Sequence, residues 1–193
     1  VFGNRSEYVQ KLFPNCTYKF SSFGVDNITP VQYNNFCTSL DFWHGISEEN
    51  ILIFQTDSFI MNTLDNMDTY LQYPFIGGVY HYYMTPEIEK QYPNQIAGYK
   101  NWTNSIENIH LNNTPIQNFS INGGFSFRKK SAMIRCIQHV TKNDILEYRK
   151  KYNMNNRYYT FSKTIGEDTY FHNALELLGY TLPSVEECNI FCN

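Results

Sequence analysis

The sequence predicts an α/β fold in which helices cover both faces of a sheet. Apolar runs of strand length alternate along the chain with stretches of helical periodicity, and this alternation is typical of such folds. No internal repeat of about 20 to 50 residues is visible. No linker rich in Gly, Ser or Pro divides the 193 residues, so we expect one domain.

The first half of the chain is expected to begin with a helix over residues 6–12 and a short strand over residues 18–20. A second helix is predicted from Pro30 to Trp43, because Thr29 is a good N-cap and proline suits the first turn. Residues 51–54 form a continuous apolar run, typical of a strand covered on both faces. Residues 75–80 predict a further strand.

In the second half, residues 85–118 show no clear periodicity and are expected to be mostly loop. Residues 120–127 predict a strand, followed by a helix over residues 129–139 with its apolar side chains on one face. Residues 144–151 predict a shorter polar helix. Residues 167–178 predict the last helix, and Gly179 is a fitting stop.

The composition excludes some classes of protein. Aromatic residues make up 17% of the chain, and such a content of large apolar side chains argues against disorder. No apolar run approaches the roughly 20 residues that cross a bilayer, so we expect no membrane span. The net charge of -3 gives no overall positive field, so we expect no nucleic-acid partner.

The five cysteines form no C-x-x-C pair, so neither a zinc site nor a disulfide framework follows, and we expect reduced thiols. They are Cys16, Cys37, Cys136, Cys188 and Cys192. Six sequons weakly favour secretion, at Asn4, Asn15, Asn27, Asn101, Asn112 and Asn118. The chain begins at Val1 without a visible signal peptide, so we expect a piece of a longer polypeptide in the cytoplasm, with the secretory lumen as the alternative.

Asp57 is the first candidate for chemistry, because ligands of open α/β sheets bind beyond the carboxyl ends of strands. It follows the apolar residues 51–54 by three positions. A carboxylate there suits a hard cation such as Mg²⁺ or Mn²⁺, which prefers oxygen ligands. The alternative is that Asp57 caps a following turn or helix.

The second candidate is the segment Asn122-Gly123-Gly124. Two glycines let a backbone approach a ligand closely, whereas the alternative interpretation is a bulge or tight bend within a strand. Ser126 and Arg128 alternate with two phenylalanines, so their side chains are expected to share one face of the sheet. Arg128 would then either bind phosphate or be solvated.

Glu167 and Asp168 open the last predicted helix. One of the two carboxylates could remove a proton from a hydroxyl group while the other holds the acceptor. The alternative needs no function, because acidic residues in the first turn are favoured by the helix dipole. The five histidines show no metal-binding spacing, and neither a G-x-S-x-G elbow nor a Walker loop occurs, so hydrolase triads and P-loop NTPases lack support.

Three segments taken in order carry a resemblance: F-Q-T-D-S at residues 54–58, N-G-G-F-S-F-R at residues 122–128 and E-D-T-Y-F at residues 167–171. Together they resemble an uncharacterised glycosyltransferase-like domain family known partly from large DNA viruses, over the chain up to about Leu182. That family looks like the GT-A nucleotide-sugar transferases. The resemblance implies a GT-A-like, Rossmann-related mixed sheet, a single domain over residues 1–193 and a further strand upstream of Val1.

The resemblance also implies roles for residues. Asp57 would bind Mn²⁺ or Mg²⁺ at the last position of a D-x-D motif, in which Gln55 departs from the pattern. Asp168 would be the general base, with Glu167 beside it. The residues implied at the nucleotide-sugar donor are Gln55, Thr56, Asp57, Ser58, Asn122, Gly123, Gly124, Ser126 and Arg128.

The implied activity is transfer of a hexose from a nucleotide sugar to a hydroxyl group of a glycan or protein. The alternative is a carbohydrate- or protein-binding module with a degenerate transferase fold and no turnover.

Overall fold

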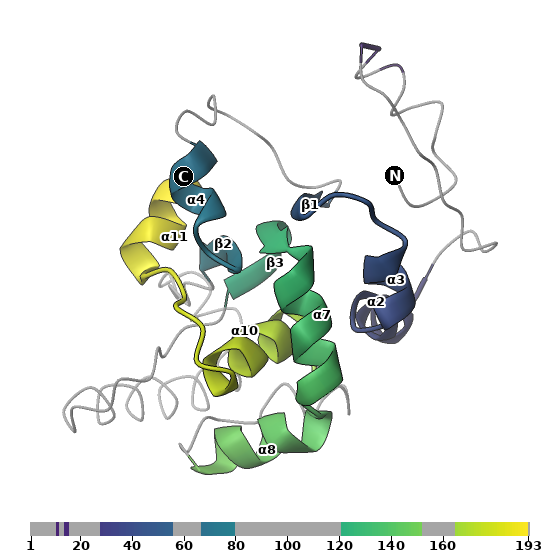
Figure 1. The fold of residues 1–193 in the computed structure, drawn as a ribbon, viewed down its shortest axis with the longest axis vertical. Coiled ribbons are helices and arrows are strands. Elements are labelled where there is room, and N and C mark those ends of the chain that lie inside the picture. Colours follow the sequence, from purple (N-terminus) through teal and green to yellow (C-terminus); the bar gives the residue numbers. More distant parts are fainter. Residues whose placement is uncertain are drawn as a thin grey trace, which may run out of the picture.

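The protein is described from a computed structural model, which places residues 11, 14–15, 28–55, 67–79, 121–151 and 165–192. These residues form a mixed α and β structure in which helices surround a small sheet (Figure 1). The α/β prediction is therefore confirmed at this level. The predictions for residues 18–20 and 85–118 lie outside the described residues, as does the helix at 6–12 apart from Lys11.

The described sheet has three strands: β1 (Asn50–Phe54), β2 (Phe75–Val79) and β3 (Ile121–Lys129). The strand β3 lies in the centre and pairs antiparallel with both neighbours. All three strands were predicted within two residues of their observed ends. Parallel pairing does not occur among these three strands.

A pronounced β-bulge interrupts the pairing of β3 with β2. Gly77 pairs with Ser126 and Val79 pairs with Ile121, so two steps along β2 correspond to five along β3. The extra residues include Asn122, Gly123 and Gly124, and we call residues 122–124 the glycine bulge. This bulge was the alternative interpretation of the Asn-Gly-Gly segment, and it is confirmed.

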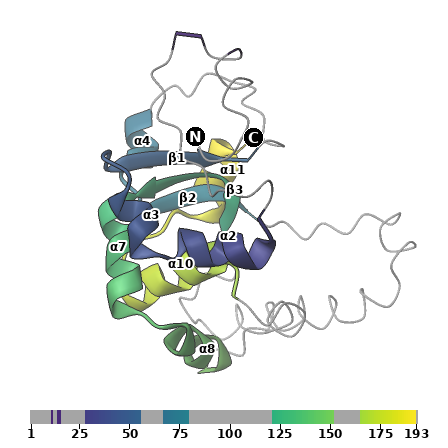
Figure 2. The ribbon, with the colours of Figure 1, turned by 90° about the vertical axis from the view of Figure 1, so that its right-hand side faces the viewer.

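One face of the sheet is covered by α4 (Met67–Leu71) and α11 (Val185–Phe191). The ring of Phe191 lies 5.4 Å from that of Phe125 and 5.8 Å from that of Phe127, while the ring of Tyr70 meets it edge-on at 5.0 Å. Alternate residues of a strand share a face, so both β3 phenylalanines point to this side. Figure 2 shows α10 on the opposite side of the sheet.

The other face is covered by α10 (Glu167–Leu177), which is the most buried helix described. Its Phe171 is fully buried, and its ring lies 5.7 Å from that of Trp43 in α3 (Leu40–His44). The buried residues of α10 are Glu167, Tyr170, Phe171, His172, Asn173, Ala174 and Leu175. This burial holds the amino end of α10 close to the strand β3.

The single helix predicted from Pro30 to Trp43 is wrong, because the segment forms two helices. The helix α2 (Pro30–Cys37) starts at Thr29 with a capping box to Gln32. The helix α3 (Leu40–His44) starts at Ser39, whose side-chain oxygen accepts a hydrogen bond from the amide of Phe42 at 3.3 Å. Ser39 has an extended backbone and is the N-cap of α3, so the first helix cannot continue through it.

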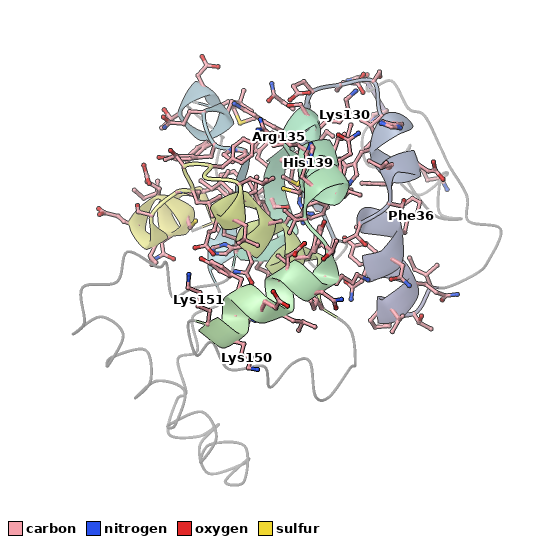
Figure 3. All side chains as sticks on the ribbon, turned by 60° about the horizontal axis from the view of Figure 1, so that its bottom comes forward. Phe36, Lys130, Arg135, His139, Lys150 and Lys151 are labelled. Atoms are coloured by element: carbon pink, nitrogen blue, oxygen red, sulfur yellow. The ribbon has the colours of Figure 1, made fainter. Side chains whose placement is uncertain are left out.

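The helices α7 (Lys130–His139) and α8 (Lys142–Lys151) follow β3 and were predicted in these places. Lys130 at the start of α7 donates to the carbonyls of Ile46 and Ser47 at 2.9 and 3.2 Å (Figure 3). Arg135 lies over the ring of Tyr180 at 5.8 Å. These contacts join α7 to the segments after α3 and α10.

Two expectations drawn from composition concern the chain as a whole. Cys37, Cys136, Cys188 and Cys192 are free thiols, as predicted, while Cys16 lies outside the described residues. Within the described part of the chain, every helix is too short or too polar to cross a membrane.

Candidate functional site

A buried ion pair joins β3 to the start of α10. Arg128 is 1% exposed and Glu167 is 4% exposed. The guanidinium donates through Nη1 to Oε2 of Glu167 and through Nη2 to Oε1 at 3.0 Å, which is a two-point contact. Its planar group also lies over the ring of Phe75 at 4.6 Å. The alternative that Arg128 is solvated is therefore wrong.

The remaining hydrogen bonds of Arg128 go to Ser126 and to the glycine bulge. Its Nε donates to the hydroxyl of Ser126 at 3.0 Å, and that hydroxyl donates to the carbonyl of Gly123 at 3.1 Å. Its Nη2 also lies 3.4 Å from the same carbonyl. A buried charge pair is tolerated only when further hydrogen bonds satisfy its polar atoms, and the bulge supplies them here.

Gly123 leaves no room for a side chain. A Cβ atom built there would lie 2.2 Å from Oε1 of Glu167 and 2.5 Å from Nη2 of Arg128. Both distances are far below van der Waals contact, so any other residue would displace the ion pair. The glycine at this position serves close approach between backbone and side chains.

The end of β1 meets the same bulge. The amide of Gln55 donates to the carbonyl of Gly124 at 2.8 Å, and the amide of Gly124 donates to Oδ1 of Asn122 at 2.7 Å. A Cβ atom on Gly124 would lie 3.1 Å from Oε1 of Gln55, which is exposed. The structure thus brings together residues from all three segments that carry the resemblance. Three of the predicted site residues lie outside the described part: Thr56, Asp57 and Ser58.

Asp168 lies beside Glu167 but has different surroundings. It is half-buried, and its Oδ1 accepts a hydrogen bond from the amide of Thr169 at 2.7 Å. Adjacent residues of a helix point about 100° apart, so the two carboxylates diverge. Both residues lie in the first turn of α10, where the helix dipole favours acidic side chains whether or not they have a function. The amide of Glu167 donates to Oδ1 of Asn34 at 3.1 Å.

Two residues of α2 that the sequence analysis did not single out, Tyr33 and Cys37, adjoin the ion pair. Burial raises the pKa of the Cys37 thiol from 9.0 to about 12, and the negative charge of nearby Glu167 adds to this. Burial and the charge of Glu167 also raise the pKa of the Tyr33 hydroxyl, which is hydrogen-bonded to the Cys37 thiol. Both groups are neutral near pH 7. Their one signal in the sequence is a spacing of four residues, which puts them on one helix face.

The possible metal ligands at the site are oxygen atoms, which suit Mg²⁺ or Mn²⁺. Gln55 supplies an exposed amide oxygen, and Oδ1 of Asn122 already accepts from Gly124. In the ranges that the structure describes, no three His, Cys, Asp or Glu side chains gather to hold an ion. The assignment of Asp57 as the metal ligand stays a prediction.

Comparisons with known proteins add a family but no activity. No curated protein and no solved structure matched the chain. One family did match, and its match covers residues 17–193, which is most of the chain and includes every segment of the site. The chain therefore belongs to the DUF5672 family, which is described as a protein of unknown function.

Proposed function

We propose that this protein is a glycosyltransferase with a GT-A-like fold, which moves a hexose from a nucleotide sugar to a hydroxyl group of a glycan or protein. The observation that carries the proposal is the meeting of Gln55, the glycine bulge and Glu167, the residue next to Asp168, around one point of the sheet. These residues come from three segments far apart in the sequence. Each segment resembles a part of a nucleotide-sugar site.

On the donor side, Asn122 and Gly124 of the bulge are half-buried, and we assign this part of the bulge to contact with the donor. The exposed side-chain amide of Gln55 supplies a donor and an acceptor for a sugar. Arg128 already shares its charge with Glu167, so it is a poor partner for a diphosphate. A divalent ion held by Asp57 would instead neutralise the leaving nucleoside diphosphate.

On the acceptor side, Asp168 is the residue that we assign as general base. Both oxygens of Glu167 accept hydrogen bonds from Arg128, whereas Asp168 is half-buried and accepts one from the amide of Thr169. A base at this place would take the proton of the acceptor hydroxyl as the sugar is transferred. We therefore assign Glu167 neither of the two roles, base or holder of the acceptor, that the sequence left open for it.

The first test is thermal stability with nucleoside diphosphates and Mn²⁺. A ligand that binds only the folded protein stabilises it by about 2.7 kcal/mol at a concentration one hundred times Kd. For a chain of this size, that corresponds to a rise in Tm on the order of 5–10 °C. If no common nucleotide shifts Tm with or without Mn²⁺, the protein is better described as a carbohydrate- or protein-binding module without turnover.

The same experiment has a catalytic arm. Asp168→Asn should keep the nucleotide-dependent rise in Tm but lose transfer by about 10²- to 10⁴-fold, because a base acts in the chemical step and not in donor binding. Transfer is measured as release of the nucleoside diphosphate. The matched control is Asp41→Asn, which changes an exposed acid in the first turn of α3. Equal rates in Asp168→Asn and the parent would remove Asp168 from the role.

A further inference from the structure

The ion pair between Arg128 and Glu167 is bonded to the part of the chain that would receive a nucleotide sugar. Arg128 reaches the carbonyl of Gly123 directly at 3.4 Å and also through the hydroxyl of Ser126. Every hydrogen bond that the structure gives the Arg128 side chain thus ends on Glu167, on Gly123 or on Ser126. The shape of the bulge and the geometry of the pair are therefore coupled.

Glu167 cannot act as an acid or base where it lies. Its side chain is 5% exposed, and both of its oxygens accept from one guanidinium. An acceptor hydroxyl has no approach to them while the pair is intact.

General stability does not explain the pair either. Two well-packed apolar residues of similar volume usually stabilise a fold as well as a buried ion pair does. Arg128 of the pair donates a hydrogen bond to the carbonyl of Gly123, which an apolar side chain cannot do.

We propose that Glu167 is a positioning residue: with Arg128 it holds the glycine bulge in the conformation that accepts the nucleotide-sugar donor. This inference rests on the proposed function, because the donor is the ligand that the bulge would position. Glu167 acts through Arg128 and Gly123 and does not touch the reacting atoms. The adjacent Asp168 keeps the chemical role.

The decisive variant replaces both charges with apolar side chains, Arg128→Met together with Glu167→Leu. It removes the hold on Gly123 without leaving a buried charge unpaired, so the protein is expected to fold with a Tm near that of the parent. The single variant Glu167→Gln should have a much lower Tm, because the charge of Arg128 then lacks its partner. If the pair only stabilises the fold, the double variant should bind nucleotide like the parent.

Two measurements on the double variant test the positioning role. We expect the Tm shift with nucleoside diphosphate and Mn²⁺ to fall to the level of an at least tenfold weaker Kd. We also expect hydrogen exchange at the amides of Gly124 and Gln55 to become at least tenfold faster, since both are bonded within or onto the bulge. This second measurement needs no ligand.

Tyr170→Phe is the matched control on the same helix. The Tyr170 hydroxyl is buried and donates to the carbonyls of Cys136 and Val140 at 3.1 and 2.7 Å, away from the bulge. Its loss should lower Tm while leaving both the exchange at the bulge and the nucleotide-dependent shift unchanged. The control therefore separates a loss of stability from a loss of positioning.

The outcomes separate the inference from the function on which it rests. If the parent binds nucleotide and the double variant matches it in shift and in exchange, the positioning role is overturned and the proposed function stands. If the parent binds no nucleotide, the proposed function fails. Hydrogen exchange at Gly124 and Gln55 then decides by itself whether the ion pair positions the bulge. Faster exchange in the double variant supports this role, and unchanged exchange overturns it.

Discussion

At position 123, the absence of one methyl group allows a buried arginine and a buried glutamate to meet beside a strand. A Cβ atom there would come within 2.5 Å of Nη2 of Arg128 and closer still to Oε1 of Glu167. The guanidinium of Arg128 cannot simply move away from such an atom, because it is packed against the ring of Phe75 at 4.6 Å. The chemistry of the site therefore depends on the smallest residue in it.

Gly123→Ala should lower the free energy of unfolding by about 1–3 kcal/mol, which is the usual cost of overpacking a tight site. The expected cause is displacement of the ion pair, and the measurement is the urea midpoint. Gly45→Ala is the control, since a Cβ atom there meets only backbone oxygens at 3.2 and 3.4 Å and this C-cap residue has right-handed helical dihedral angles. Equal effects of the two substitutions would contradict the role assigned to Gly123.

At the scale of elements, local signals explain where most helices begin. The helix α11 starts at Ser184, which forms a capping box with Glu187: its hydroxyl accepts from the Glu187 amide at 3.2 Å. The carboxylate of Glu187 accepts a hydrogen bond from the Ser184 amide at 2.7 Å and another from the hydroxyl of Tyr73. This cap sets the direction of the helix that places Phe191 against the sheet.

Ser184→Ala should lower the free energy of unfolding by about 1 kcal/mol, as expected for loss of an N-cap side chain. Urea denaturation followed by circular dichroism measures the change. Thr181→Ala provides the comparison, because Thr181 is exposed and precedes the helix. A loss as large for Thr181→Ala as for Ser184→Ala would show that the cap is not the cause.

The elements also show what the sequence analysis missed and why. The capping box of α11 was readable as Ser184-x-x-Glu187 but was not used. The helix α4 has only five residues, which is too short for a periodic pattern to appear. The break between α2 and α3 depends on Ser39 ending one helix and capping the next, a choice that apolar periodicity alone conceals.

At the scale of the whole molecule, the buried thiols should make the folded protein less stable at alkaline pH. Burial raises the pKa of Cys136 and of Cys188 from 9.0 to about 12, and it does the same for Cys37. Above pH 9.0 the unfolded chain releases these protons while the folded chain still holds them. Fewer protons bound in the unfolded state means that stability falls as pH rises.

The free energy of unfolding should therefore be level with respect to these thiols below pH 9.0 and decrease between pH 9.0 and about 12. Urea midpoints measured with a reductant present would show the decrease. Cys136→Ala should make the decrease shallower by the contribution of one proton. A Cys136→Ala protein whose stability falls as steeply as that of the parent would contradict this explanation.

The sequence by itself determined the positions of most strands and helices, the glycine bulge as one of two interpretations, and the acidic start of α10. These features depend on residues within a few positions of one another, through periodicity, capping and the freedom of glycine. The same short-range signals marked residues 122–124 and Glu167 as candidates, whereas Gln55 was a candidate only through the family resemblance. They did not say which candidates would touch.

Only the tertiary structure decided that Arg128 is buried and paired with Glu167, a residue 39 positions away. It also decided that β3 lies between two antiparallel neighbours and that Tyr33, Asn34 and Cys37 of α2 adjoin the ion pair. The physical reason is that burial and ion pairing depend on which faces meet in space. An arginine in a strand has the same local pattern whether water or a carboxylate lies opposite it.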